Sequence, residues 1–205
     1  DKFNFYYYNR IIPLDVIKKN YKIKINLMKK SFIIKDEEID KLNENDIVIH
    51  IRSGDIFNKN PNPLYIPPPL AYYVNILNKN IYKKIIIVCE DDINPVVNKL
   101  LELYENAVYK KKTLNEDIKL ILGGTNIISS VGTFVNSLLM FSNNVKNHYV
   151  IKIYNDKLKE YNFSHYVKND YETINYSDEV KEYYLIAKPW KNTKEQQKYI
   201  LSYKM

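Results

Sequence analysis

Cysteine, glycine and long apolar runs are scarce in this sequence. The scarcity of cysteine argues against a disulfide-bonded protein, and the lack of long apolar runs argues against a membrane-spanning one. The single cysteine, Cys89, cannot form a disulfide within the chain, and the apolar residues around it are typical of a buried strand. We therefore interpret Cys89 as a buried thiol and not as a nucleophile. No apolar run approaches the roughly 20 residues that a membrane-spanning helix needs, so we expect no membrane span. The 4 glycines accompany an abundance of Lys, Asn, Ile and Tyr, a bias that indicates no function.

Clustered metal ligands are also missing from the sequence. The 3 histidines, His50, His148 and His165, are scattered along the chain, and no spacing of His, Cys and carboxylates is typical of a metal site. The acidic triplet Glu90 to Asp92 is the one alternative. We expect neither a metal nor a cofactor.

The length and charge of the chain restrict its class further. A chain of 205 residues is long enough for one well-buried domain, and we expect a single domain over residues 1–205. The balance of 31 basic and 24 acidic residues gives a net charge of +7, which suits a phosphate-bearing ligand, a polyanion or an anionic membrane surface. The lysines are spread along the chain, so we expect no nucleic-acid partner. A basic nucleic-acid-binding domain with exposed aromatic residues stays as an alternative.

The start of the chain and its assembly are left open by the sequence. We expect a cytoplasmic protein. Because residue 1 is Asp and not Met, the sequence can start inside a longer gene product, and the protein would be lumenal if an N-terminal anchor has been removed. Nothing in the sequence indicates an oligomeric state.

Apolar runs alternate with amphipathic segments from Asp46 onward. The sequence predicts strands at 46–51, 84–89, 108–109 and 126–130, and helices at 70–78, 96–104, 115–122, 132–142 and after Asn192. Residues 1–45 are predicted to be a helical extension, with helices near 14–20 and 36–43. Strands that alternate with helices form parallel sheets with helices on both faces. The fold class is therefore α/β, with a Rossmann-like core over residues 46–205.

Three loops follow predicted strands and lie where ligands bind in such sheets, beyond the carboxyl ends of the strands. Loop one is HIRSGDIF, residues 50–57. Arg52 can clamp a phosphate with two parallel hydrogen bonds, Gly54 allows close approach of the backbone, and Asp55 can hold the arginine in place. The alternative is a surface turn in which Arg52 and Asp55 form an exposed ion pair and His50 packs at the strand end.

Loop two is CEDDINP, residues 89–95, with three consecutive carboxylates after a buried strand. One of these carboxylates can accept a proton or bind sugar hydroxyls. The alternative is that an Asp caps the helix that begins near Pro95. Both can hold for different residues.

Loop three is SSVGTF, residues 129–134, at the predicted start of a helix. Its hydroxyls and backbone amides suit an anion, so Ser130 and Thr133 are candidates for binding phosphate. The alternative is that Ser130 or Thr133 only caps the helix.

These loops resemble motifs of the fucosyltransferase superfamily that contains the α-1,2-, α-1,6- and protein O-fucosyltransferases. HIRSGD is similar to the HxRRGD motif of that superfamily, in which the first arginine binds the phosphates of the donor, and Arg52 occupies its place. Ser53 replaces the second arginine. The segments YIPPPL (65–70) and PWKNTKEQQKYILSY (189–203) resemble those of relatives that carry HIRSGDIF. The resemblance covers residues 47–203.

The same resemblance extends to the other two loops. It implies that Glu90 and Asp91 match an acidic pair at the end of the second strand. In the third motif, an acidic residue leads a helix and an S-x-G-T-F turn follows a strand, and the residues that match are Asp117, Ser130, Gly132, Thr133 and Phe134.

The resemblance implies a metal-independent glycosyltransferase that moves a sugar, fucose being favoured, from a GDP-linked donor to a glycan hydroxyl. The chain would then resemble the donor-binding half of a GT-B enzyme. Arg52, Glu90 and Asp91 would be catalytic, and the donor would be bound by the residues that match the motifs, namely His50, Arg52, Gly54, Asp55, Asp117, Ser130, Gly132, Thr133 and Phe134. The alternative function is a non-catalytic nucleotide- or carbohydrate-binding module with a degenerate transferase fold.

Overall fold

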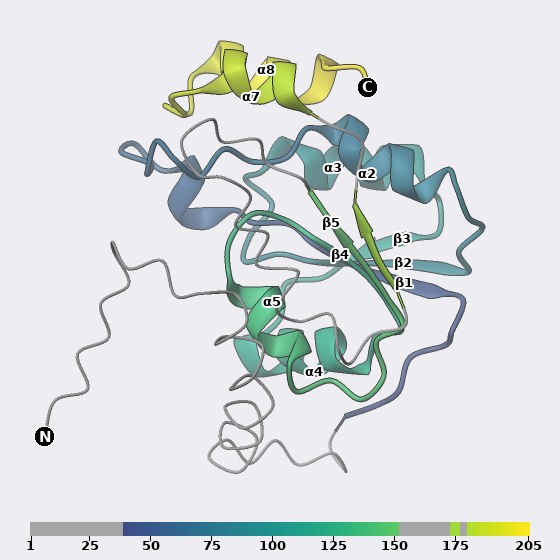
Figure 1. Cartoon of the computed structure of the whole chain (residues 1–205). Helices are drawn as coiled ribbons and strands as arrows, with labels where there is room; N and C mark the ends of the chain where they lie inside the picture. The colour runs from purple at the N-terminus through teal and green to yellow at the C-terminus, as the bar shows by residue number, and fades with distance from the viewer. Residues whose placement is uncertain (1–38, 152–172, 177–179) are drawn as a thin grey trace, which may run out of the picture. The chain divides into compact units, whose positions relative to one another are not determined.

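A parallel β-sheet forms the centre of the computed structural model of the protein (Figure 1). The structure describes residues 39–151, 173–176 and 180–205, all within one unit of the chain, Lys35–Met205. In these residues the sheet has six strands in the order β3-β2-β1-β4-β5-β6, and every neighbouring pair is parallel. The strands are β1 (Asp46–His50), β2 (Lys84–Val88), β3 (Ala107–Tyr109), β4 (Asn126–Ser129), β5 (Asn147–Val150) and β6 (Thr173–Tyr176).

Helices connect the successive strands from β1 to β5, as the alternation in the sequence predicts. The helices are η2 (Gly54–Phe57, a 3-10 helix), α2 (Leu70–Leu77), α3 (Pro95–Leu103), α4 (Leu114–Gly123), α5 (Phe134–Leu139), α7 (Lys181–Ala187) and α8 (Lys194–Ser202). This order of strands and helices gives the Rossmann-like α/β fold that the sequence predicts.

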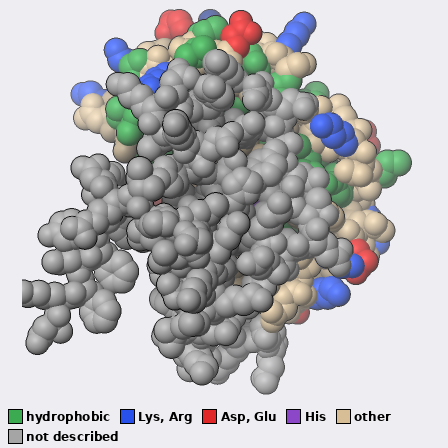
Figure 2. Space-filling view, viewed as in Figure 1, with side chains coloured by type: hydrophobic (Ala, Val, Ile, Leu, Met, Phe, Trp, Pro, Cys, Tyr) green, Lys and Arg blue, Asp and Glu red, His purple; other side chains and the backbone are tan. Residues whose placement is uncertain are grey.

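The two faces of the sheet carry different helices because successive strand residues point to opposite sides. Ile47 and Ile49 of β1 belong to a core cluster with α2, α3, α7 and α8, whereas Val48 between them packs in a second cluster with α4 and α5. Figure 1 shows the first group of helices above the sheet and the second group below it. Near α7 and α8, Figure 2 shows hydrophobic, basic and acidic side chains together at the surface.

The direction of the chain across the sheet reverses between β1 and β4. The path from β1 to β3 runs outward through α2 and α3 on one face, and α4 then returns it to β4, next to β1, on the other face. The loops that leave β1 and β4 therefore diverge to opposite faces. In α/β sheets of this kind a ligand crevice lies at such a switch point, beyond the carboxyl ends of the strands.

Local signals explain where the helices start. Asn94 caps α3, since its side chain accepts a hydrogen bond from the Val96 amide at 3.0 Å, and Pro95 stands at the first helical position. Thr113 with Glu116 and Thr193 with Gln196 form capping boxes at α4 and α8. The cap of α3 is thus an asparagine, where the sequence had suggested an aspartate.

Some elements differ from the sequence-based prediction. The predicted helix at 36–43 is wrong for residues 39–43, which have no regular structure. The Leu42 amide instead donates to the carbonyl of Gly123 at 2.9 Å, so this segment docks on the end of α4. The α5 helix is shorter than the predicted 132–142, and β5, β6 and α7 were not predicted. The helix expected near 14–20 lies outside the described residues. Among the described residues, every helix is too short or too polar to span a lipid bilayer.

Candidate functional site

Loop one and loop three meet at the switch point between β1 and β4. A Cβ atom placed on Gly132 would lie 2.8 Å from Nη1 of Arg52, so the guanidinium occupies the space that the glycine leaves open. The rings of His50 and Phe134 are 5.5 Å apart between centroids, which joins the two loops a second time. Four of the residues expected at the site therefore lie together, although Arg52 and Gly132 are 80 residues apart in the chain.

The guanidinium of Arg52 is held by neighbours on several sides. Its Nη2 and Nε donate to the two carboxylate oxygens of Asp55 at 2.7 and 3.2 Å, and its Cζ lies 4.0 Å from the centroid of the Tyr65 ring. The hydrogen bonds with Asp55 raise the pKa of Arg52, and the same hydrogen bonds lower the pKa of Asp55. The pair is partly exposed, with 24% of the Arg52 side chain and 59% of the Asp55 side chain accessible. Arg52 is thus a fixed, permanently charged and partly exposed group at the switch point.

The Arg52–Asp55 ion pair and the packing of His50 on Phe134 are also what the surface-turn alternative for loop one predicts. What that alternative does not predict is the contact between Nη1 of Arg52 and Gly132 of loop three.

Loop one is also tied to loop two, through Ser53. This side chain is buried, with 2% of its surface exposed. Its hydroxyl donates to Oδ1 of Asp91 and accepts from the Asn94 amide at 3.1 Å. The Asn94 side chain in turn donates to the carbonyl of Arg52 at 2.9 Å. We call Ser53, Asp91 and Asn94 the clasp.

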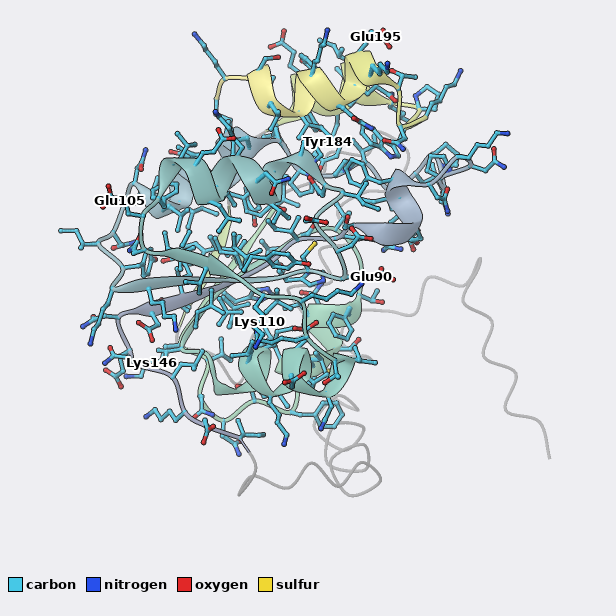
Figure 3. The ribbon with its side chains drawn as sticks, turned by 180° about the vertical axis from the view of Figure 1, so that it is seen from behind. Glu90, Glu105, Lys110, Lys146, Tyr184 and Glu195 are labelled. Carbon is cyan, nitrogen blue, oxygen red and sulfur yellow. The ribbon has the colours of Figure 1, made fainter. Side chains whose placement is uncertain are left out.

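The two candidate carboxylates of loop two have different surroundings. Oδ1 of Asp91 accepts from both Ser53 and the amide of Ile93, the latter at 3.1 Å. Glu90 is exposed, and its carboxylate fills the position that a side chain on Gly54 would occupy. Figure 3 shows Glu90 at the edge of the sheet opposite to Glu105 and Lys146, which precede β3 and β5. Glu90 therefore lies at the carboxyl ends of the strands.

Glycine is favoured by the backbone conformation at both close contacts. Gly54 has φ of 54° and Gly132 has φ of 111°, and both angles lie where residues with a side chain are strained. Gly54 thus allows loop one to approach Glu90, and Gly132 allows loop three to approach Arg52.

Loop three places its two hydroxyl residues differently from each other. Oγ of Ser130 is buried and has no well-formed hydrogen bond among the described residues, although it is close enough to the hydroxyl of Tyr73 to lower the pKa of that group against the larger effect of burial. Thr133 is exposed and makes no capping hydrogen bond to α5. The simple capping role considered for Thr133 is therefore wrong. Ser130 is thus a buried residue of loop three, and Thr133 is an exposed one.

His50 sits beneath Arg52 as a neutral ring. Burial, and secondarily the charge of Arg52, lowers the pKa of His50 to about 4. Its Nδ1 is buried without a hydrogen-bond partner in the described part of the chain. A neutral His50 adds no positive charge to the site, which leaves that role to Arg52.

Asp117 lies farther along the same edge of the sheet, in the first turn of α4. Burial raises the pKa of Asp117. Its charge acts on Tyr109 at the end of β3, as do the charges of Asp91 and Asp92. Asp117 thus belongs to the β3 side of the edge, whereas Arg52 belongs to the switch point.

The C-terminal segment braces loop one, which the sequence did not predict. The indole of Trp190 donates to the carbonyl of Ile56 at 2.6 Å, and the Asn192 side chain donates to the carbonyl of Phe57 at 2.6 Å. Tyr183 of α7 donates to the carbonyl of Pro67 at 2.8 Å. Their partners are backbone carbonyls more than 100 residues away in sequence, so no local pattern could have indicated them.

Tyr65 and Asn94 were also missed as parts of the site. Tyr65 was noted only within YIPPPL, and nothing in that segment indicates that the ring would lie over a guanidinium. Asn94 directly precedes Pro95, a signal of a helix cap that could have identified it. No cluster of three or more His, Cys, Asp or Glu side chains suited to a metal ion occurs in the described ranges.

The site thus contains the fixed guanidinium of Arg52 and the exposed carboxylate of Glu90, each in close contact with a glycine. Such a group of residues can bind an anion and accept a proton beside it. No protein-family model matches the chain, and no curated protein sequence matches it either.

Proposed function

We propose that the protein is a glycosyltransferase that binds a nucleoside-diphosphate sugar in the crevice between the carboxyl ends of β1 and β4. The donor favoured by the motif resemblance is GDP-fucose, and the acceptor is a glycan hydroxyl. The observation that carries the proposal is the position of Arg52, whose Nη1 faces Gly132 of loop three at the switch point. A relationship to the donor-binding half of GT-B enzymes is part of the same proposal.

The donors of Arg52 support a role in binding diphosphate. A guanidinium has five N–H groups, and Asp55 takes one from Nε and one from Nη2. The guanidinium also interacts with Tyr65, and the N–H groups that Asp55 and Tyr65 leave can be shared with phosphate oxygens near loop three. Because Asp55 and Tyr65 hold the guanidinium in place, little side-chain entropy would be lost when a diphosphate binds.

The proposed reaction is a displacement at the anomeric carbon of the donor. The oxygen of the acceptor hydroxyl bonds to this carbon as the bond from the carbon to the diphosphate breaks. The electron pair leaves with the diphosphate, whose growing negative charge Arg52 stabilises. The hydroxyl proton passes to a carboxylate of loop two, for which Glu90 and Asp91 are the candidates. Arg52 supplies positive charge at the leaving group, so the proposal includes independence from added divalent metal.

Nucleotide binding by the wild-type chain and by Arg52→Ala tests the proposal. A thermal-shift panel of GDP, UDP, dTDP and their sugars should show a shift for one base with the wild-type protein, since a ligand bound to the native state raises the unfolding temperature. Arg52→Ala should lose that shift. Release of the diphosphate in the presence of a glycan acceptor, unchanged by EDTA, should follow for the same donor. A shift that is equal in both proteins would contradict the role of Arg52.

The alternative is a nucleotide- or carbohydrate-binding module without transferase activity. It is favoured by one observation: Ser53 stands where the related motif has a second arginine, and its side chain is turned into the clasp and not toward the crevice. Such a module would bind the nucleotide with the same dependence on Arg52 but release no diphosphate with any acceptor.

A further inference from the structure

We propose that the clasp of Ser53, Asp91 and Asn94 positions Arg52 and Glu90, and that Glu90, not Asp91, receives the proton of the acceptor hydroxyl. The assignment of the clasp stands on the hydrogen bonds of loops one and two alone. The assignment of Glu90 rests on the proposed transferase function.

The clasp uses the one donor of the Ser53 hydroxyl and one of its two acceptor sites. The hydroxyl donates to Asp91 and accepts from the backbone of Asn94, and the side chain is almost fully buried. The buried backbone amide of Asn94 would be left unsatisfied without this partner, which costs more than the hydrogen bond itself contributes. Ser53 therefore fixes the distance between loop one and the start of α3.

The same clasp holds the backbone of Arg52. The Asn94 side chain donates to the Arg52 carbonyl with Nδ2 and accepts from the Val96 amide with Oδ1. One side chain thus joins the cap of α3 to the residue that faces loop three. Loop one cannot move away from loop two unless these bonds break, so Arg52 is anchored through its backbone as well as through Asp55.

The surroundings of the two carboxylates separate their roles. Asp91 is turned into the clasp, with Oδ1 engaged by Ser53 and by the Ile93 amide. Glu90 is exposed at the carboxyl edge of the sheet and lies against Gly54, two residues from Arg52 (Figure 3). As the acceptor oxygen bonds to the anomeric carbon and the diphosphate leaves, the acceptor proton passes to Glu90. Asp91 is then a positioning residue.

The single cysteine provides a test of the clasp that needs no ligand. Cys89 is buried directly before Glu90, and Ser53 hydrogen-bonds near its thiol. Opening the clasp should expose this thiol to iodoacetamide. We expect Ser53→Ala to be alkylated about tenfold faster than the wild type in native buffer, which corresponds to about 1.4 kcal/mol in the opening equilibrium. Ser202→Ala, a matched change at an exposed site on α8, should not alter the rate.

Two further variants keep the test valid if Ser53→Ala does not fold. Asn94→Asp retains the oxygen that caps α3 but removes the donor to Arg52, and it should also accelerate alkylation. Asp91→Asn retains an oxygen that can accept from Ser53 and Ile93, so its rate should stay within about twofold of the wild type, a small free-energy difference. Equal rates in Ser53→Ala, Asn94→Asp and the wild type would overturn the clasp.

Transfer kinetics separate Glu90 from Asp91. Glu90→Gln should lower kcat by about 100-fold or more, the usual effect of removing a general base. Asp91→Asn should lower kcat far less. Asp91→Ala should lower kcat and also make the Cys89 thiol react faster with iodoacetamide. Glu105→Gln, a matched change at the opposite edge of the sheet, should leave kcat unchanged (Figure 3).

The outcomes also distinguish this inference from the proposed function. If Asp91→Asn loses activity as severely as Glu90→Gln while its alkylation rate is normal, Asp91 is a proton acceptor and the assignment to Glu90 is overturned. If the wild type transfers no sugar, the role of Glu90 fails together with the proposed function. In that case the alkylation rates still decide whether the clasp exists.

Discussion

The guanidinium of Arg52 shows how few side chains are needed to fix a charge at the edge of a sheet. Asp55 takes two of its donors, Tyr65 covers one face, and Gly132 leaves room for Nη1. Each contact is individually small, because exposed ion pairs contribute little to stability. Their joint effect is to restrict the rotamers of Arg52, which would reduce the entropy lost in the proposed binding of a diphosphate.

Gly132→Ala tests the approach of Arg52 to loop three. A methyl group there would meet Nη1 of Arg52 at 2.8 Å, on a residue whose φ is 111°. We expect a loss of about 1–3 kcal/mol in the free energy of unfolding from the backbone alone, together with weaker nucleotide binding. Urea denaturation and calorimetric titration measure the two effects. Thr193→Ala, which removes the cap of α8 and about 1 kcal/mol, should lower stability without changing binding.

The thiol of Cys89 should be inert in the native protein. Burial raises the pKa of this thiol to about 12, against the opposing effect of nearby hydrogen bonds. Because the thiolate is the reactive form, Ellman's reagent at pH 8 should titrate almost no thiol in native buffer and one thiol per chain in denaturant. Rapid reaction in native buffer would show that the end of β2 opens readily.

At the scale of the elements, the C-terminal segment after α7 acts as a brace for loop one. Trp190 is 1% exposed, donates to the carbonyl of Ile56, and packs edge-on against Phe57 with 5.6 Å between ring centroids. Asn192 holds the next carbonyl along the chain. Segments from opposite ends of the described sequence therefore stabilise one another.

Trp190→Phe isolates the hydrogen bond from the packing of this brace. The phenyl ring can keep the contact with Phe57 but cannot donate to the carbonyl of Ile56, which is left buried without its partner. We expect a loss of about 1–3 kcal/mol in the free energy of unfolding. Far-UV circular dichroism in urea is the suitable measurement, because the variant lacks the only tryptophan. An unchanged urea midpoint would mean that a water molecule donates to the Ile56 carbonyl in place of the indole without loss of stability.

At the scale of the whole molecule, two neutral histidines couple stability to pH. Burial lowers the pKa of His50 and of His148 to about 4. In the unfolded chain both would titrate near 6.5, so the unfolded state binds more protons than the native state between these values. Acidification through that window must therefore favour unfolding.

We expect the free energy of unfolding to fall as the pH is lowered from about 6.5 to 4, by at most about 1.4 kcal/mol per pH unit for each group. Urea denaturation at several pH values in this range measures the slope. His50→Gln should reduce the slope, because it removes one of the two groups. Carboxylates with a lowered pKa, such as Asp55, stop contributing to the free energy of unfolding only at a more acidic pH than this window. A free energy of unfolding that does not change over this pH range would indicate that the imidazoles of His50 and His148 are exposed to solvent.

Much of the fold follows from local patterns that act without tertiary context. The β-branched runs of β1 and β2 are apolar on both faces because both faces are buried, and this pattern predicts central parallel strands. Helix signals such as Pro95 lie in the local sequence as well. Prediction failed where the local pattern is weak. Strand β5 was missed because it contains few apolar residues. The helix predicted over 39–43 is absent, and Leu42 of this segment instead donates a hydrogen bond to the end of α4.

The sequence by itself determined that strands and helices alternate, that loops one to three follow strands, and that Arg52, Glu90 and Gly132 stand in those loops. Periodicity and turn chemistry are local properties, so they can be inferred from neighbouring residues. Only the tertiary structure decided that Arg52 faces Gly132, that Ser53 joins Asp91 and Asn94, and that Trp190 braces loop one. These contacts depend on the order of the strands, which brings β1 beside both β2 and β4, and on side-chain directions that no local pattern encodes.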